Sequence, residues 1–317
     1  MILISQLAKN LINEESVAIF LHIRPDGDAI GSGIALSLAL KLKGVKADVY
    51  CDDEIPLRFS YLNAETLIKK EIDKKYSCYL AVDCADLGRL GGFSELFINN
   101  KNTYNIDHHI SNGRYAKYNY VVDNASNCEN VFELIKEMNV ETDSRVATAL
   151  ITGIITDTGN LKHNNVKAET VARLSELVRY GGDLHSVIYY NFSLQSQERA
   201  LLFGQTMSKI KYYYDGRLAM ATVFKEDLER TNAKPYETEG FIDFIMGING
   251  VKVGVCIMEL EKNKFKASLR GNDTDVNAIA NVFGGGGHIL AAGCQYKGDY
   301  NEFLDKLLYA VKQHLAD

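Results

Sequence analysis

Short apolar runs alternate with helical patterns through the first half of the chain, and this alternation constrains the fold more than any other feature. The runs SVAIFLHI, ADVYC, CYLAVD and TYNID are rich in β-branched and aromatic residues, and each has the length of one buried strand. The stretch AIGSGIALSLALKLKG between the first two has the length of a buried helix. Apolar strands separated by helices predict a parallel sheet with helices on both faces.

The pattern changes to hairpins in the last third of the chain. Asp215-Gly216 marks a turn inside IKYYYDGRLAMATVF, and Lys262-Asn263 separates VKVGVCIMEL from KFKASLRG. A chain of 317 residues is long enough for two cores. We therefore predict an α/β protein with a parallel-sheet domain over residues 1–190, a linker helix over 191–210 and a smaller α/β domain over 211–317.

The charge and the cysteine content restrict the classes of partner that the protein can bind and the cellular compartment in which it works. With 35 basic and 41 acidic residues, the net charge of -6 argues against long duplex nucleic acid, although a small anionic substrate remains compatible. The six cysteines form no CxxC pair, so we interpret them as small buried side chains in a reducing compartment. We find neither a signal peptide nor a run of about 18 apolar residues, so we expect a cytoplasmic protein with no membrane partner.

Acidic and histidine residues fall where the predicted strands end. His22 ends the first strand, Asp83 ends CYLAVD, and His108 follows TYNID. The carboxyl ends of parallel strands share one edge of the sheet, where ligands of such folds bind. We expect Asp26 and Asp28 to reach the same edge from a tight loop across Gly27.

The next segments add a helix start and another acidic residue. Gly31 and Gly33 are expected to let a helix begin close to the Asp26 loop, where an anion is favoured. Farther along, a buried helix that starts at Asp143 or Ser144 leads into a turn that carries Asp157.

Together these positions supply four carboxylates and two imidazoles, from His22, Asp26, Asp28, Asp83, His108 and Asp157. Crowded carboxylates repel one another, and divalent cations relieve that repulsion. Mixed oxygen and nitrogen ligands favour Mn²⁺, with Mg²⁺ or Co²⁺ as alternatives, and the absence of cysteine ligands argues against structural zinc. Because the ligands are too many for one hydrolytic ion, we predict two. Taken alone, DGD is usually a turn, DHH is usually a surface loop, and Asp157 could be a capping residue. The metal site is favoured because all of these motifs occur in order along the chain, each at the end of a predicted strand or helix.

The same residues lie in motifs that resemble those of the DHH phosphoesterase family. HIRPDGDAIGS at 22–32, VDCAD at 82–86, DHH at 107–109 and TDTG at 156–159 resemble its four motifs. FGGGGH at 283–288 and AAG at 291–293 resemble its DHHA1 substrate-binding domain. VDCADLGRLG and SLRG at 268–271 are most similar to the oligoribonuclease/pAp phosphatase branch, the nanoRNases.

The resemblance implies roles for individual residues. His22, Asp26 and Asp83 would hold one manganese, while Asp28, Asp83, His108 and Asp157 would hold the other, with Asp83 bridging. His109 would contact or protonate the substrate, and a water or hydroxide between the metals would attack phosphorus. The residues expected to bind substrate are Arg89, His163, Arg270, Gly284, Gly285, Gly286, Gly287 and His288. For the glycines, a flexible loop is the alternative, and for Arg89 and His163 an ordinary surface role.

Two positions depart from the family pattern. ASNCEN at 125–130 lacks the usual run of hydroxyl side chains, and Cys128 stands where threonine is common, which questions one hydroxyl contact to phosphate. His163 stands where an aromatic residue is frequent, so base stacking there would be altered.

The expected activity is hydrolysis of 3′-O–P bonds. Substrates would be oligoribonucleotides of about two to five nucleotides, including linear pApA and pGpG, cleaved to 5′-mononucleotides, and pAp, dephosphorylated to AMP. The alternatives are a cyclic-dinucleotide phosphodiesterase and a catalytically silent nucleotide sensor. A family II inorganic pyrophosphatase would lack GGGGH, and a processive exonuclease would carry an OB-fold and a basic groove. The sequence leaves open the preferred substrate, the polarity of cleavage, the cellular metal and a homodimer.

Overall fold

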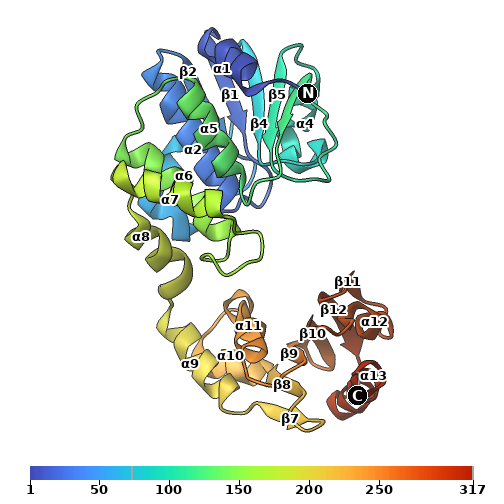
Figure 1. Ribbon diagram of the computed structural model, residues 1–317. Coiled ribbons are helices and arrows are strands. Elements are labelled where there is room, and N and C mark those ends of the chain that lie inside the picture. Colours follow the sequence, from blue (N-terminus) through green and yellow to red (C-terminus); the bar gives the residue numbers. More distant parts are fainter. Residues whose placement is uncertain (73, 316–317) are drawn as a thin grey trace. The chain divides into compact units, whose positions relative to one another are not determined.

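The computed structural model describes residues 1–72 and 74–315, and the chain divides into two compact units, Met1–Leu194 and Gln195–Asp317 (Figure 1). The first unit is built on a six-stranded sheet ordered β3-β2-β1-β4-β5-β6, in which every neighbouring pair is parallel. Its strands are β1 (Ser16–Phe20), β2 (Lys46–Tyr50), β3 (Ile68–Lys69), β4 (Cys78–Val82), β5 (Thr103–Asp107) and β6 (Tyr118–Val121). The parallel sheet predicted from the alternating pattern is confirmed.

Both faces of this sheet are covered by helices, as expected. Val17 and Ile19 of β1 belong to one buried cluster, which includes residues of α1 (Ile4–Ile12), α2 (Gly27–Leu42), α5 (Asn127–Glu137) and α6 (Ser144–Asp157). Phe20 belongs to a second cluster with aromatic residues of η2 (Leu87–Phe93) and α4 (Ser94–Ile98). The remaining helices of the unit are η1 (Leu57–Leu62), α3 (Ala64–Leu67), α7 (Ala168–Arg179), α8 (Leu184–Ile188) and η3 (Tyr189–Ser193). The apolar strands therefore bury side chains in both directions.

The strand order reverses its direction between β1 and β4. The chain runs outward from β1 to β3 on one side and from β4 to β6 on the other, so the connections leave the sheet edge in opposite directions. Ligands of open α/β sheets bind at this point, outside the carboxyl ends of the strands. His22 follows β1 there, and Asp83 follows β4.

The start of α2 differs from the expected loop. Asp26 is the N-cap of this helix, and its side chain accepts hydrogen bonds from the backbone amides of Asp28 and Ala29. The helix begins at Gly27, so Gly31 and Gly33 lie within it and do not open it. A Cβ atom on Gly31 would lie 2.3 Å from the Ala149 carbonyl oxygen. This glycine therefore lets α2 approach α6, which sequence spacing alone could not reveal.

The second unit is built on a mixed sheet ordered β11-β12-β10-β9-β8-β7. Its strands are β7 (Lys211–Tyr213), β8 (Leu218–Val223), β9 (Val253–Glu261), β10 (Lys264–Gly271), β11 (Gly286–His288) and β12 (Ala291–Lys297). The hairpins β7–β8 and β9–β10 are confirmed, whereas β8 and β9 pair in parallel.

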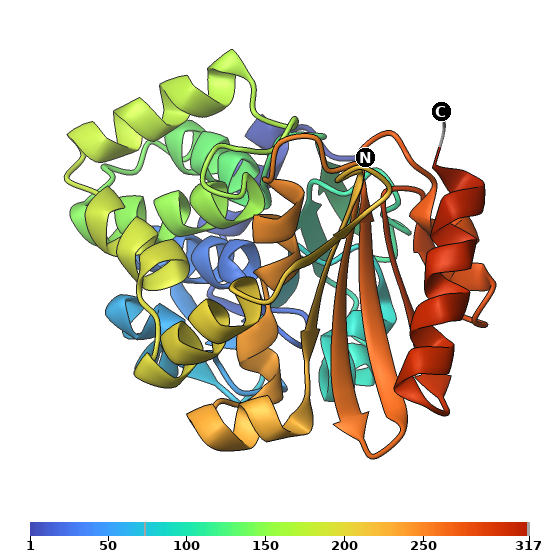
Figure 2. The same ribbon diagram turned by 90° about the horizontal axis from the view of Figure 1, so that it is seen from below.

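Helices cover the second sheet in two groups. The helices of the unit are α9 (Gln197–Met207), α10 (Lys225–Thr231), η4 (Pro235–Thr238), α11 (Phe241–Met246), α12 (Val276–Asn281) and α13 (Tyr300–His314). Phe303 and Leu307 of α13 pack with Phe265 and Leu269 of β10, and Figure 2 shows α13 running along the sheet. The helix that we expected as a linker, α9, packs into this unit through the buried side chain of Leu202.

All six cysteines are buried and none forms a disulfide, as expected for small apolar side chains. Within residues 1–72 and 74–315, no helix combines the length and apolar character needed to cross a bilayer.

Candidate functional site

Three of the predicted metal ligands meet beside the end of β1. His22 Nε2 lies 3.7 Å from Asp26 Oδ2 and 3.6 Å from Asp83 Oδ2. His22 and Asp83 are buried, whereas Asp26 is half-exposed at the start of α2. One nitrogen and two carboxylate oxygens this close together could hold a metal ion.

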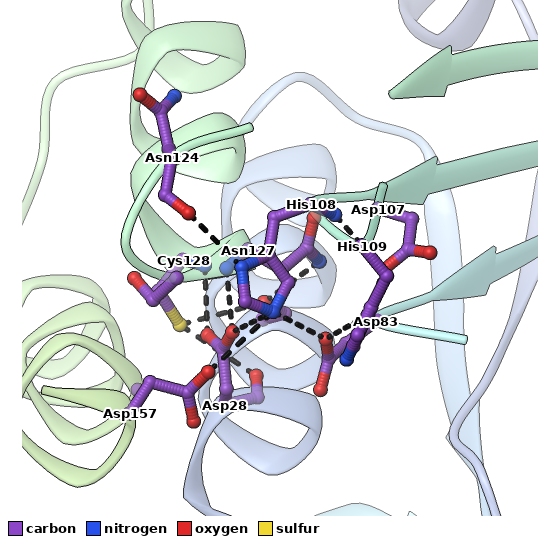
Figure 3. A network of polar contacts seen from close by, with 12 residues as sticks. Asp28, Asp83, Asp107, His108, His109, Asn124, Asn127, Cys128 and Asp157 are labelled. Carbon is purple, nitrogen blue, oxygen red and sulfur yellow. Dashed lines mark hydrogen bonds and ion pairs between the residues drawn. The ribbon is translucent and has the colours of Figure 1, made fainter. Parts of the chain in front are cut away.

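A second group lies on the other side of Asp83 (Figure 3). His108 Nε2 lies 3.8 Å from Asp28 Oδ2, 3.5 Å from Asp157 Oδ2 and 3.5 Å from Asp83 Oδ1. Asp28, His108 and Asp157 could also hold a metal ion. Asp157 is the last residue of α6 and not part of the following turn. Asp83 thus directs one carboxylate oxygen to each group, and all six predicted ligand residues converge.

Asp83 has an unusual backbone conformation. Its φ of 52° lies in the left-handed region, which non-glycine residues enter at a cost. Its amide donates a 2.9 Å hydrogen bond to the Ile106 carbonyl, which continues the pairing of β4 with β5. Strained residues of this kind concentrate at functional sites, because only the surrounding structure can impose them.

Backbone carbonyls orient the two histidines. His22 Nδ1 lies 2.8 Å from the Ile23 carbonyl oxygen, and His108 Nδ1 lies 3.1 Å from that of Asn124. A carbonyl can only accept, so each Nδ1 carries the proton and each Nε2 lone pair faces the carboxylates. This is the arrangement in which neutral histidine binds metals. The buried Asn130 side chain fixes the loop by accepting from Asn124 and donating to the Val122 carbonyl.

Asp28 is held by the start of a helix distant in sequence. Its carboxylate accepts hydrogen bonds from the amides of Asn127 and Cys128, at 2.5 and 2.8 Å, in the first turn of α5. The Cys128 thiol is fully buried and lies 3.4 Å from Ser32 Oγ. The Cys128 amide therefore holds Asp28, and the Cys128 side chain is too deeply buried to contact a substrate phosphate. A hydroxyl contact to phosphate is thus not expected from a side chain at this position.

The carboxylates are poorly compensated without a cation. Burial and the nearby negative charges raise the pKa of Asp28 and of Asp83, and raise the pKa of Asp157 to about 10. Among the described residues, the buried atoms Asp83 Oδ1 and His108 Nε2 have no hydrogen-bond partner. Divalent cations would satisfy both atoms and neutralise the carboxylates, so the residues present fit a metal centre.

This electrostatic arrangement predicts how the metal-free protein responds to pH. A carboxyl group whose pKa folding raises stabilises the protein below its unfolded pKa, and the stabilisation is lost as pH rises through the folded pKa. For Asp157 this window extends from the ordinary 3.8 to about 10. Asp26 acts outside it: burial raises its pKa, but in the metal-free protein the His22 ring, when protonated, and the α2 amides of Asp28 and Ala29 outweigh that and lower it to about 2.

We therefore expect the Tm of the protein in EDTA to fall between about pH 6 and about pH 9, and Mn²⁺ to remove most of that fall. Thermal unfolding with and without Mn²⁺ measures it. Asp157→Asn is the control, because it should flatten the slope in EDTA. A metal-free Tm that rises with pH over this range would contradict the electrostatic account.

His109 lies beside the second group and pairs with a residue to which the sequence analysis gave no role. Its Nδ1 donates a 2.7 Å hydrogen bond to Asp107 Oδ1 and lies 3.7 Å from Asp83 Oδ1. The hydrogen bond with Asp107 raises the pKa of His109. Burial would raise the pKa of Asp107, but hydrogen bonds from His109 and Asn112 outweigh it and lower that pKa. Asp107, the aspartate with which the DHH motif begins, is the sequence feature that could have indicated this pair.

Arg89 and His163 lie at the margin of the metal groups. Arg89 Nη2 is 2.9 Å from His22 Nδ1. His163 is exposed, and its Nδ1 donates to the Asp157 carbonyl, so its ring lies beside the residue that ends α6. Arg89 and His163 therefore contact the ring or the backbone of a candidate ligand, and their role in substrate binding stays a prediction.

In the second unit, Arg270 and His288 occupy one row of the sheet. Arg270 pairs with Ala291, which in turn pairs with His288, so their side chains emerge on the same face. The glycine run is not a free loop, because Gly286–His288 forms β11. Cβ atoms at Gly285 and Gly287 would lie 2.3 and 2.5 Å from the carbonyl oxygens of Gly293 and Ala291. These glycines permit close packing on β12, a role that the prediction of substrate binding did not include.

Comparison with known proteins agrees with this architecture. The sequence model of the family described as “DHH family, N-terminal domain” matches residues 16–154, and the sequence model of the DHHA1 domain matches residues 215–317. The bifunctional oligoribonuclease and PAP phosphatase NrnA of Thermus thermophilus is 32% identical over 308 residues, covering 96% of this chain and 91% of that protein. The protein of the same name in Bacillus subtilis is 22% identical and covers 91% and 92%.

A solved structure shares the fold. The exopolyphosphatase-related protein of Bacteroides fragilis has a TM-score of 0.84 and 24% identity, covering 98% of this chain and 95% of that one. The fold and the converging motif residues define an α/β protein with DHH and DHHA1 domains. The chain belongs to the DHH phosphoesterase family.

Proposed function

We propose that this chain is a metal-dependent hydrolase of 3′-O–P bonds in short oligoribonucleotides and in pAp. The observation that carries the proposal is the convergence on Asp83 of two metal-binding groups, one at each carboxylate oxygen. The similarity to proteins named bifunctional oligoribonuclease and PAP phosphatase supports the choice of substrate. Linear dinucleotides such as pApA and pGpG fall within this class.

The proposed metal ligands follow the two groups. His22, Asp26 and Asp83 would hold one ion, and Asp28, Asp83, His108 and Asp157 the other. Carboxylate and imidazole ligands without thiolate favour Mn²⁺, with Mg²⁺ or Co²⁺ as alternatives. Such ions lower the pKa of bound water and neutralise charge on phosphoryl oxygens.

Protonation of the leaving group is assigned to His109. Its Nδ1 is engaged by Asp107, so its Nε2 is free to donate to the departing 3′-oxygen, and Asp107 stabilises the ring as a cation. Asp107 is thus a positioning residue, in contact with the imidazole and not with the substrate.

Substrate phosphates are assigned to arginine and histidine side chains in both units. The Ile23 carbonyl fixes the proton on His22 Nδ1, so the Arg89 guanidinium faces another donor and gains by turning to an anion. In the second unit, Arg270 offers a fork that matches phosphate. Among the described residues β11 is an edge strand, so backbone amides on its outer side, beside His288, could also donate to a phosphate.

The single bond type explains two substrates. In a dinucleotide, the 3′-oxygen joins one nucleoside to the phosphate of the next, and in pAp it carries the terminal phosphate. Hydrolysis releases a nucleoside 3′-hydroxyl in both cases.

The direct test is the Mn²⁺-dependent release of AMP from 5′-labelled pApA, measured beside pAp and cyclic di-AMP. Turnover of the cyclic compound alone, or of none of the three with metal bound, would overturn the proposal.

Replacement of His109 by glutamine should separate proton donation from metal binding. We expect kcat on pApA to fall by about a hundredfold to ten-thousandfold, because the 3′-alkoxide is a poor leaving group without an acid. Hydrolysis of a p-nitrophenyl phosphodiester should fall far less, since nitrophenolate leaves unprotonated. Calorimetry with Mn²⁺ is the companion measurement. Equal losses on both substrates, together with weaker Mn²⁺ binding, would make His109 a ligand instead of the acid.

A further inference from the structure

A cavity of about 400 Å³ lies within the second unit, between the sheet and the segment that connects η4 to α11. One wall is formed by β9 and β10, and the other by residues 235–243. Small-molecule sites in proteins span roughly this volume and above. Apart from Arg270, the residues that line this cavity have no role in the function proposed above.

The sheet wall carries positive charge. Lys266, Ser268 and Arg270 occupy every second position of β10, so their side chains share one face, while Phe265 and Leu269 point into the core on the other. Lys266 lies across from Met258 of β9, an apolar side chain that also lines the cavity. This wall therefore presents the cations of Lys266 and Arg270 and the Ser268 hydroxyl next to the apolar side chain of Met258.

The facing wall carries an aromatic ring and two carboxylates. Tyr236 is 75% exposed, and Glu239 and Asp243 line the cavity beside it. Arg199 of α9 fixes this wall by donating two 2.8 Å hydrogen bonds, to the carbonyls of Glu237 and Glu239. The ring is thus presented to solvent by a segment tied to a helix, so little ordering is needed for a ligand to stack on it.

We propose that this cavity binds a nucleoside 5′-phosphate unit of the substrate, with Tyr236 and Lys266 as specificity-determining residues. Cations on β10 receive the phosphate, the Tyr236 ring stacks on the base, and the carboxylates accept hydrogen bonds from ribose hydroxyls or base amino groups. Inorganic phosphate would use the cations alone and leave the aromatic ring without a role. The inference rests on the proposed function and adds a nucleoside subsite to it.

Binding of AMP to the full-length protein in EDTA isolates this cavity from the metal centre. Tyr236→Leu removes the ring, and Tyr236→Phe is its matched control. Lys266→Met removes the charge but keeps the stem, and Lys264→Met is the control on the same strand outside the cavity lining. Tyr236 and Lys266 are exposed and Lys264 is partly exposed, so the folded state should tolerate all four changes.

We expect Tyr236→Leu and Lys266→Met each to weaken AMP binding by calorimetry by about tenfold, with both controls within about twofold. With Mn²⁺ added, the KM for pApA should rise similarly while kcat stays within about twofold. Hydrolysis of bis(p-nitrophenyl) phosphate, which has no nucleoside, should not change.

Two outcomes would overturn the inference. One is AMP binding that Tyr236→Leu and Lys266→Met leave unchanged, and the other is an equal effect of each control. The proposed function fails separately, if the unaltered protein with Mn²⁺ does not hydrolyse pApA. In that case AMP binding to the metal-free protein still decides whether the cavity is a nucleoside-phosphate site.

Discussion

Asp83→Asn should lower kcat on pApA by at least about a thousandfold, because a bound metal contributes several kcal/mol to the transition state. Asp83 is the residue through which the two candidate metal groups meet, since each of its oxygens faces a different histidine. Asparagine has the same shape but lacks the charge and the second carboxylate oxygen. The substitution therefore removes the proposed shared ligand and keeps the packing.

The same variant should have the opposite effect on stability without metal. The Asp83 carboxylate is buried and repelled by Asp28, Asp26 and Asp107, which raises its pKa. Removing that charge should raise the Tm in EDTA, whereas the stabilisation by Mn²⁺ should shrink or vanish. Asp123→Asn, at an exposed position in the loop after β6, is the charge-matched control and should change neither quantity. Full activity of Asp83→Asn, or a lower Tm in EDTA, would refute the assigned role.

The second large effect is expected at Gly153, in the middle of α6. Glycine inside a helix is normally unfavourable, so alanine there should stabilise by propensity alone. At Gly153, however, a Cβ atom would lie 2.3 Å from both Asp28 Oδ1 and Cys128 Sγ. We expect Gly153→Ala to destabilise the protein by about 1–3 kcal/mol, because the buried neighbours have no room to move.

Displacement of Asp28 should carry this effect to the metal centre, so Mn²⁺ binding should weaken as well. Gly204→Ala in α9 is the matched control, because no described atom outside its own stretch of helix lies within 4 Å of the added methyl group. That variant should gain about 0.4–1 kcal/mol. Denaturant unfolding and Mn²⁺ calorimetry on both variants make the comparison. A stabilised Gly153→Ala protein with unchanged metal affinity would show that α2, α5 and α6 are not packed around Asp28 as described.

The approximate position of the site could be predicted from the sequence because it depends on strand ends. His22 and Asp83 each follow an apolar run, and parallel strands bring their carboxyl ends to one edge. The conformation at that edge could not be predicted. Asp26 resembles a turn residue in sequence, yet it caps α2, because the cap depends on where the helix begins.

Contacts between distant segments account for most of what sequence reasoning missed. The amides that hold Asp28 belong to Asn127 and Cys128, about 100 residues away, and no local pattern links them. Cys128 suggested a lost phosphate contact, because the sequence did not show that its side chain packs beside Ser32 instead of facing the substrate. Similarly, the glycine run at 284–287 suggests a ligand loop, while the register of β11 against β12 gives two of its glycines a packing role.

The central claim is that Asp83 joins two divalent ions in one site. Diffraction from crystals grown with Mn²⁺, recorded at the manganese absorption edge, tests it without reference to any substrate. We predict two anomalous peaks per chain, both in contact with the Asp83 carboxylate, one beside His22 and the other beside His108. A single peak, or two peaks of which one does not touch Asp83, would contradict the account.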